Sequence, residues 1–199
     1  MLTKREDRQL FLEVPDRFEP ITIHDSVVAH DLSTDAAVIR LANASFEWGL
    51  EFLNLEIQRA PEIEAGDIEV YMGMGFPVRE TSYEADTGTV GLKLVNYRAF
   101  EYPEAYDALG LPRSRFVVIR FDRKLAYHKG FVRPMKLPHG MSGGGLWRFW
   151  GPRTEAPTVA RGGFAGILTE YRETPVKCMI SVGLSPLQDL ASDLIRRSH

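Results

Sequence analysis

Hydrophobic and polar residues alternate along much of the chain, which is the pattern of β-strands that bury one face. In Asp67–Gly75, for example, Ile68, Val70 and Met72 fall on the same face. Six strand-like segments follow a connector at Ala60–Gly66: Asp67–Gly75, Thr89–Tyr97, Arg115–Phe121, Gly144–Trp150, Gly163–Tyr171 and Lys177–Gly183. About three precede it: Gln9–Val14, Ile21–Ala29 and Asp35–Leu41. The number and spacing of these segments favour antiparallel barrels or sandwiches.

One helix is predicted, at the C-terminal end. Ser185 is the expected N-cap, Pro186 occupies the first helical position, and Gln188 completes a capping box. The residues that follow form one apolar stripe: Leu187, Leu190, Ala191, Leu194 and Ile195. We expect this stripe to pack on a barrel.

The composition indicates a packed chain with no disulfide crosslinks. Of the 199 residues, 44% are hydrophobic and 26% are charged, as in folded domains. The single cysteine, Cys178, has no partner for an internal disulfide, and we interpret it as a small buried side chain. The net charge of −3 and the lack of a basic block disfavour a nucleic-acid partner.

No apolar run has the length of a membrane span, so no membrane partner is expected. The N-terminal stretch MLTKREDRQL is too highly charged for a signal peptide. We therefore expect a cytoplasmic protein if Met1 is the true start; otherwise the compartment stays open.

The segment Gly140–Gly144 surrounds a serine with glycines. A serine hydroxyl becomes a nucleophile only when a base accepts its proton, and acyl transfer also needs N–H groups aimed at the developing oxyanion. Glycine permits the dihedral angles that turn successive N–H groups inward. The N–H groups of Gly140 and Ser142 are therefore candidate oxyanion donors, with Ser142 attacking. The alternative is a glycine-rich turn with an incidental serine.

The same residues also match G-x-S-x-G, the nucleophile elbow of α/β-hydrolases, which needs a buried strand before the serine and a helix after it. Two prolines, Pro134 and Pro138, interrupt the preceding stretch, and the following Gly144–Trp150 favours a strand. The acid and the histidine would also have to follow the serine, but the only later histidine is His199. These observations exclude the elbow.

A candidate acid lies upstream of the serine. Asp35 begins an apolar segment, 107 residues before Ser142, and a carboxylate there can orient an imidazole and stabilise its protonated form. The alternative for Asp35 is an ordinary turn or strand-start residue.

Together, TDAAVIRL (34–41) and GMSGGG (140–145) resemble the trypsin-like (chymotrypsin-fold) serine peptidases. That family carries D-[ILA]-A-[LV]-[IL]-x-L around its triad aspartate and G-x-S-G-G around its nucleophile, in this order. DIEVYMGMGFP (67–77) is similar to the strand and turn that open the family's second barrel, and GGFAGILTEY (162–171) to the strand after the nucleophile. The likeness extends from roughly Gln9 to the end and is closer to bacterial single-domain members than to digestive enzymes. Met141 replaces the acid of many secreted members, so activation by a freed N-terminus is not expected.

The resemblance implies an all-β fold of two antiparallel six-stranded barrels, the first incomplete, with a C-terminal helix. Residues 1–58 would be the remnant of the N-terminal barrel and residues 59–184 the C-terminal barrel that carries the nucleophile. Residues 185–199 would form the helix. An incomplete barrel would expose apolar faces and unpaired strand edges.

The resemblance also assigns site residues by position. Ser142 would be the nucleophile, Asp35 the orienting acid, and Gly140 an oxyanion donor together with Ser142. The edge of the later strand would bind peptide by β-augmentation through Leu168, Thr169, Glu170 and Tyr171. Lys136 lies six residues before the serine, where members often place the base of the specificity pocket, and would favour an acidic substrate side chain. The alternative for Lys136 is a solvent-facing loop residue.

The family's general base is a histidine well upstream of the aspartate, and it is the part of the triad that this sequence lacks. The chain has five histidines: His24, His30, His128, His139 and His199. Only His24 and His30 precede Asp35, and both belong to the strand that leads to it. We expect them on the outer side of an edge strand.

Three explanations for the missing base stay open. The chain is a fragment or has a mis-assigned start, so that the histidine is encoded upstream of Met1; this is the explanation we favour. Alternatively, it is a catalytically dead relative that keeps the peptide-binding cleft. In the third explanation, His30 or His139 serves as an unorthodox base.

The sequence therefore predicts a serine endopeptidase by lineage, truncated or inactive in its printed form. The alternative is a peptide-binding module of the same fold. In either case a polypeptide is the expected substrate or ligand. No metal or cofactor is expected, because the histidines lack zinc-type spacing, the single cysteine has no second cysteine beside it and no glycine-rich phosphate loop opens a helix.

Overall fold

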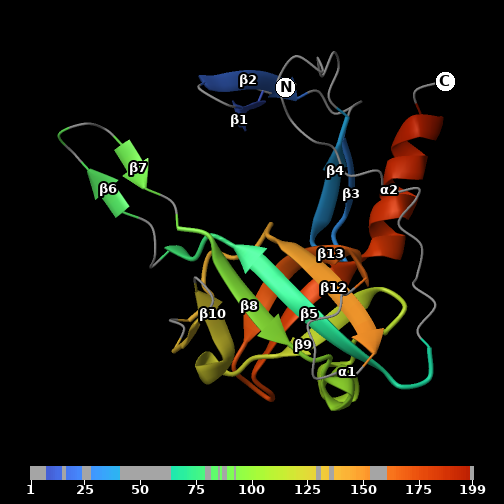
Figure 1. Ribbon diagram of the computed structural model, residues 1–199. Coiled ribbons are helices and arrows are strands. Elements are labelled where there is room, and N and C mark those ends of the chain that lie inside the picture. The colour runs from blue at the N-terminus through green and yellow to red at the C-terminus, as the bar shows by residue number, and fades with distance from the viewer. Residues whose placement is uncertain are drawn as a thin grey trace. The chain divides into compact units, whose positions relative to one another are not determined.

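The computed structural model describes residues 8–14, 17–23, 28–40, 64–78, 82–84, 86, 89–91, 93–128, 131–134, 137–152 and 161–197. The chain divides into two compact units, residues 1–57 with 187–199 and residues 58–186. Each unit is described by itself. The described residues form mostly β-strands, with few helices (Figure 1). The predicted all-β class is confirmed in this coarse form.

The larger unit is built on one antiparallel sheet with the strand order β11-β10-β8-β5-β12-β13-β14-β9. These strands are β5 (Asp67–Gly75), β8 (Val95–Ala99), β9 (Phe116–Arg120), β10 (Ala126–His128), β11 (Phe131–Arg133), β12 (Gly145–Pro152), β13 (Arg161–Arg172) and β14 (Cys178–Gly183). The sheet curls, and a bridge between Glu101 and Ile119 joins the chain just after β8 to β9. The N–H of Tyr102 donates to the Val118 carbonyl at 2.8 Å beside this bridge. The six strands from β8 to β9 are therefore barrel-like.

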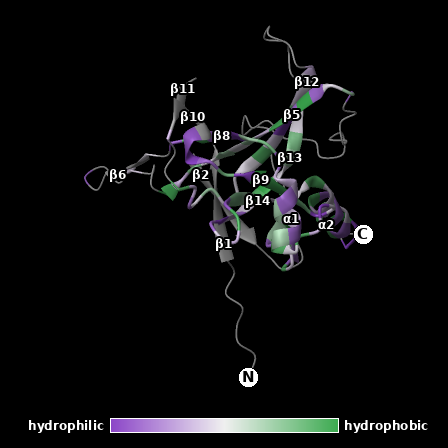
Figure 2. Ribbon diagram, turned by 90° about the horizontal axis from the view of Figure 1, so that it is seen from below, coloured by the Kyte–Doolittle hydropathy of each residue, from purple (hydrophilic) through white to green (hydrophobic). Residues whose placement is uncertain are grey.

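The core is formed by buried positions of the strands of this sheet, together with Phe121, which follows β9, and Met141 of the loop before β12. Its buried members are Tyr71, Val95, Tyr97, Ala99, Ile119, Phe121, Met141, Leu146, Leu168 and Met179. Figure 2 shows the hydrophobic stretch of β9 beside β14. Cys178, at the start of β14, is fully buried, and burial raises the pKa of its thiol to about 11. Since it stays protonated at neutral pH, Cys178 fits the packing role expected for it.

The predicted strand Thr89–Tyr97 is wrong as a single element. It consists of β7 (Thr89–Gly91), which pairs with β6 (Ser82–Glu84), and of β8, which pairs with β5. Lys93 and Leu94, both exposed, separate the two strands. In TVGLKLVNY the alternation of Val90, Leu92 and Leu94 changes phase at Leu94-Val95, where β8 begins, so adjacent apolar residues were the local signal of this break.

A short helix, α1 (Pro103–Leu109), also escaped the sequence prediction, as did β6, β10, β11 and the 3₁₀ turn η4 (Arg123–Leu125). Pro103 occupies the helix start, and Gly110 ends the helix in the left-handed conformation with φ +65°. The Gly110 N–H donates to the Asp107 carbonyl at 3.3 Å, and the Leu111 N–H donates to the Tyr106 carbonyl at 3.0 Å. The signals that could have revealed this helix are the proline at its first position and the glycine directly after its last residue.

The smaller unit contains two hairpins and most of a helix. One hairpin joins β1 (Arg8–Val14) to β2 (Arg17–Ile23), and the other joins β3 (Val28–Asp31) to β4 (Ala36–Ile39). Among the described residues these pairs form separate two-stranded sheets, so the predicted barrel remnant stays a prediction.

The C-terminal helix is confirmed as α2 (Leu184–Arg196). It begins at Leu184, one residue before the expected N-cap at Ser185. Within the predicted stripe, Leu187 and Leu194 are buried, whereas Ile195 is 55% exposed. Over the part of the chain that the structure describes, no helix combines the length and the hydropathy needed to cross a membrane.

The hydroxyl of Tyr97 fixes the end of β9 to β8. Tyr97 is fully buried; its oxygen accepts the Asp122 N–H and lies 3.1 Å from the carbonyl oxygens of Arg120 and Asp122. Burial raises the pKa of Tyr97 to about 12, so it remains a donor at neutral pH. We expect Tyr97→Phe to lower the free energy of unfolding in urea by about 1–3 kcal/mol, because it leaves these groups without their partner. Tyr83→Phe, at a side chain that is 69% exposed, is the control, and equal losses in the two variants would contradict this role.

Candidate functional site

The loop that carries Ser142 is hydrogen-bonded to strand β13. Gly145, the first residue of β12, pairs with Ile167. The pairing then continues into the loop, because the Leu168 N–H donates to the Gly144 carbonyl and the Gly143 N–H donates to the Leu168 carbonyl, each at 2.8 Å. Two regular backbone hydrogen bonds thus hold the loop in place next to the serine.

Glycine is required at two positions of this loop. Gly140 has φ +90°, and a Cβ there would lie 2.4 Å from Val78 Cγ2. At Gly144 a Cβ would lie 2.2 Å from the Met74 carbonyl oxygen, which belongs to backbone that cannot easily move. Glycine is therefore needed because the loop comes close to Met74 of β5 and to Val78, and because the backbone at Gly140 has a positive φ.

The N–H groups of the loop are alternately paired and free. Those of Met141, Gly143 and Gly144 donate to the carbonyls of Pro138, Leu168 and Met141, at 3.1, 2.8 and 2.9 Å. In the part of the chain that the structure describes, the N–H groups of Gly140 and Ser142 have no acceptor. These two are the donors that the sequence predicts for an oxyanion, and their function stays a prediction.

The Ser142 hydroxyl donates to the carbonyl oxygen of Thr169 at 2.8 Å. Thr169 is the extra residue of a β-bulge, because the register between β13 and β14 shifts between Leu168 and Glu170. Bulges redirect backbone and side-chain groups and are frequent beside functional sites. A carbonyl oxygen accepts the hydrogen bond but does not take the proton, so this contact orients the hydroxyl without activating it.

Beyond the bulge, one edge of β13 is open among the described strands. Glu170, Tyr171 and Arg172 pair with β14, whereas β12 pairs with β13 only as far as Ile167. The segment named for peptide binding, Leu168 to Tyr171, therefore lies in β13, but Leu168 already bonds to the loop. The open edge begins at Thr169.

Within the larger unit, no described histidine ring contacts the Ser142 hydroxyl. The His139 ring lies edge-on to the Tyr171 ring, with the ring centroids 5.6 Å apart, and the Tyr171 hydroxyl donates to Glu173 at 3.3 Å. His30 is exposed on β3, opposite Ala37, as expected for the outer side of a strand. Within the described residues of the larger unit, no imidazole is thus placed as a base for Ser142; His30 belongs to the smaller unit, so its role stays a prediction.

Asp35 lies in the turn that joins β3 to β4. It is exposed and has φ +53°, a conformation that aspartate tolerates in turns. The neighbouring Asp31 orders this turn, since its carboxylate accepts the N–H and the hydroxyl of Ser33 at 2.9 and 2.7 Å. Asp35 belongs to the smaller unit and Ser142 to the larger one, so their pairing stays a prediction.

Several predicted positions fall outside the described residues. They are the specificity residue Lys136 and the histidines His24 and His199. The side chain of His128 is likewise outside the description.

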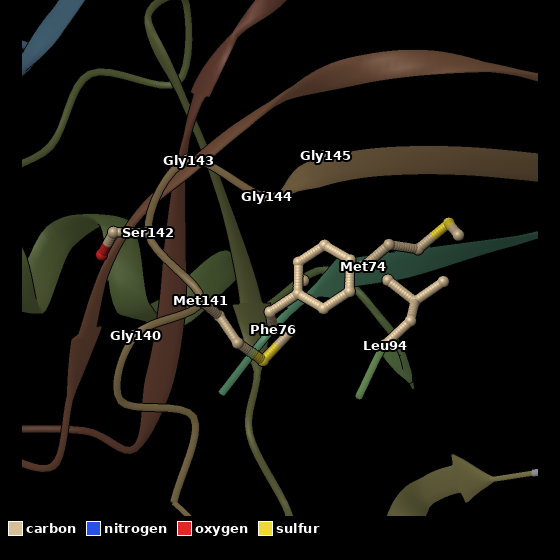
Figure 3. A pocket seen from close by; sticks show the side chains of 10 residues that line it. Met74, Phe76, Leu94, Gly140, Met141, Ser142, Gly143, Gly144 and Gly145 are labelled. Carbon is tan, nitrogen blue, oxygen red and sulfur yellow. The ribbon is translucent and has the colours of Figure 1, made fainter. Parts of the chain in front are cut away.

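A cavity of about 450 Å³ lies beside the serine loop. Its walls are the glycines of the loop and the side chains of Met74, Phe76, Leu94 and Met141. Figure 3 shows Met141 pointing toward Phe76, whereas the Ser142 hydroxyl points to the other side of the loop. The sequence analysis singled out the loop but missed this cavity, because Met74, Phe76 and Leu94, which complete its walls, are ordinary apolar residues at strand ends that nothing local distinguishes from core.

No family model, curated protein or solved structure matches this chain. The comparisons therefore give no support to a trypsin-like assignment, which depends on the resemblance of sequence segments alone. Within the described residues there is also no group of three His, Cys, Asp or Glu side chains placed to hold a metal ion.

Gly144→Ala tests the close approach of the loop to β5. We expect it to lower the free energy of unfolding by about 3 kcal/mol, because the new Cβ meets backbone. Gly143→Ala is the matched control: Gly143 has a similar φ of +87°, but a Cβ there meets nothing within 4 Å. Its cost should be about 1 kcal/mol, from the left-handed conformation alone. Equal losses in urea denaturation would show that Gly144 is not in contact with Met74.

Proposed function

We propose that the serine loop and the open edge of β13 form a peptide-binding site of the serine-peptidase type. The observation that carries this proposal is the pair of free N–H groups on Gly140 and Ser142, which flank the paired N–H of Met141. Two nearby donors without acceptors suit a peptide carbonyl oxygen. The same peptide can add its backbone to β13 from Thr169 onward, as an extra strand.

The β-bulge supports this proposal. It turns the Thr169 carbonyl toward the Ser142 hydroxyl, so the hydroxyl is held beside the two free N–H groups. A carbonyl group bound by those N–H groups would lie near the serine oxygen. The arrangement therefore brings together an acceptor site, a positioned hydroxyl and an open strand edge.

Hydrolysis would need one further group. Attack by the Ser142 oxygen on a peptide carbonyl forms an ester and releases the amine, and the hydroxyl proton must pass through a base to the leaving nitrogen. The described residues offer the hydroxyl only the Thr169 carbonyl. We therefore expect this chain to bind peptides and to hydrolyse them very slowly. Where characterised triads lose one member, roughly 10³–10⁴-fold catalysis over water persists.

A serine endopeptidase is the second candidate function, favoured by the position of Ser142 beside the free donors. In that case Asp35 would orient an imidazole that the described residues of the larger unit do not place at Ser142. A serine endopeptidase of this type would have two antiparallel six-stranded barrels. The barrel-like sheet would be the second of them, and the two hairpins would belong to an incomplete first barrel. The joining of β9 to β8 through Glu101 and Ile119 supports the barrel in the larger unit.

Peptide binding can be tested by NMR with a tryptic digest of casein as the probe. We expect the amide signals of Gly140, Ser142 and Tyr171 to shift as peptide is added. The N–H groups of Gly140 and Ser142 would bind a peptide carbonyl, and Tyr171 lies on the strand edge to which the peptide would add. The amide of Gly110, at the end of α1, is the control and should not move. Equal, small shifts at all four positions at saturating peptide would contradict the site.

Fluorophosphonate labelling separates the two candidate functions. In this reaction the Ser142 oxygen bonds to phosphorus, fluoride leaves and the proton goes to a base. We expect slow labelling that added imidazole accelerates about tenfold or more, since a general base contributes roughly 10²–10⁴-fold. Ser142→Ala should abolish labelling.

The histidines are controlled with a double variant, His30→Ala with His139→Ala. We expect it to label at the same rate as the parent chain. Fast labelling without imidazole that this double variant loses would show that one of these histidines is the base. Fast labelling that it keeps would mean that the chain holds a base elsewhere, and would favour the endopeptidase.

A further inference from the structure

We infer that the cavity beside the serine loop is a specificity pocket for one large, uncharged apolar side chain of the bound peptide. It would receive a residue on the side of Ser142 that faces away from β13. This inference rests on the proposed peptide-binding function and adds the class of side chain that the site selects.

The chemistry of the cavity sets the class of ligand. Its volume of about 450 Å³ is within the roughly 300–1,000 Å³ of small-ligand pockets. The side chains of Met74, Phe76, Leu94 and Met141 line it beside Ser142 and the loop glycines, and none of the described lining residues is charged. A buried charge without a partner is strongly disfavoured, so a lysine or aspartate side chain would be excluded and a leucine or phenylalanine accepted.

The position of the cavity sets which part of a peptide reaches it. The loop runs between the two halves of the site: Ser142 bonds to Thr169 of β13 on one side, and Met141 points toward Phe76 on the other (Figure 3). A peptide paired with the β13 edge, with a carbonyl on the N–H groups of Gly140 and Ser142, leaves β13 as it crosses the loop. The residues after that carbonyl then come over the cavity.

The rim of the cavity shows apolar side chains to solvent. Phe76 is 45% exposed and Leu94 is 44% exposed. Val78 is not itself a lining residue, but its side chain lies against Gly140, which is one, and it is 65% exposed. Exposed apolar groups gathered around one cavity mark a surface that a ligand covers. The β13 edge beside them fits an extended peptide better than a compact partner.

This pocket differs from the one expected from the sequence. That expectation placed selectivity at Lys136 and favoured an acidic side chain. The cavity selects an apolar side chain instead, and on the far side of the serine from β13. Selection at one position does not exclude selection at the other.

The test uses short, fluorescein-labelled peptides of alternating Ser and Ala, in which a single Leu, Phe, Asp or Lys is moved along the sequence. Binding to the full chain is measured by fluorescence anisotropy. At one position of the scan, we expect Leu and Phe to bind about tenfold or more tightly than Asp and Lys, because only an apolar side chain gains from burial there. Phe76→Ser should remove this preference.

Phe100→Ser is the matched control. Phe100 also follows a strand directly and is 54% exposed, but it does not line the cavity, so this variant should keep the preference. Leu94→Asp provides a gain of function, since it should shift the preference toward Lys at the same position. Equal binding of all peptides, or loss of the preference in Phe100→Ser as well, would overturn the pocket while leaving peptide binding intact. No binding by any peptide would overturn the pocket and the proposed function together.

Discussion

The site depends on two hydrogen bonds between the serine loop and Leu168 of β13. They continue the β12–β13 pairing past Gly145 and use the N–H of Gly143 and the carbonyl of Gly144. Because these groups are committed to β13, the loop between Pro138 and Gly144 has a fixed path, and the N–H groups of Gly140 and Ser142 are left without acceptors. The bulge at Thr169 and the cavity at Phe76 lie on the two sides of this path.

The geometry around Ser142 meets the requirements of peptide binding more fully than those of catalysis. In the proposed function, free N–H groups, an open strand edge and an apolar pocket hold an extended peptide. Bond cleavage needs, in addition, a group that takes the Ser142 proton, and the Thr169 carbonyl cannot do so. Peptide binding therefore needs only what the larger unit contains, whereas peptidase activity also needs an imidazole and the carboxylate of Asp35 brought to Ser142.

The sequence predicted the parts of the fold that depend on local alternation. Asp67–Gly75 is observed as β5 with the predicted bounds, and Cys178 is buried as expected. The break between β7 and β8 was missed although the apolar alternation changes phase at Leu94-Val95. The bulge at Thr169 was missed because it depends on the pairing of β13 with β14 and leaves no local signal. The loop glycines indicated an unusual backbone conformation, as observed at Gly140. Glycine is also required in this loop by close contacts with Met74 and Val78, which only the fold brings near it.

The most direct test of this account is native-state hydrogen exchange, by NMR, of the amides from Gly140 to Gly144 in the free protein. The account predicts alternation: the amides of Met141, Gly143 and Gly144 are protected, whereas those of Gly140 and Ser142 exchange at rates close to those of an open chain. Uniform protection of all five amides, or uniform lack of it, would show that the loop does not present two free donors and would contradict the central claim.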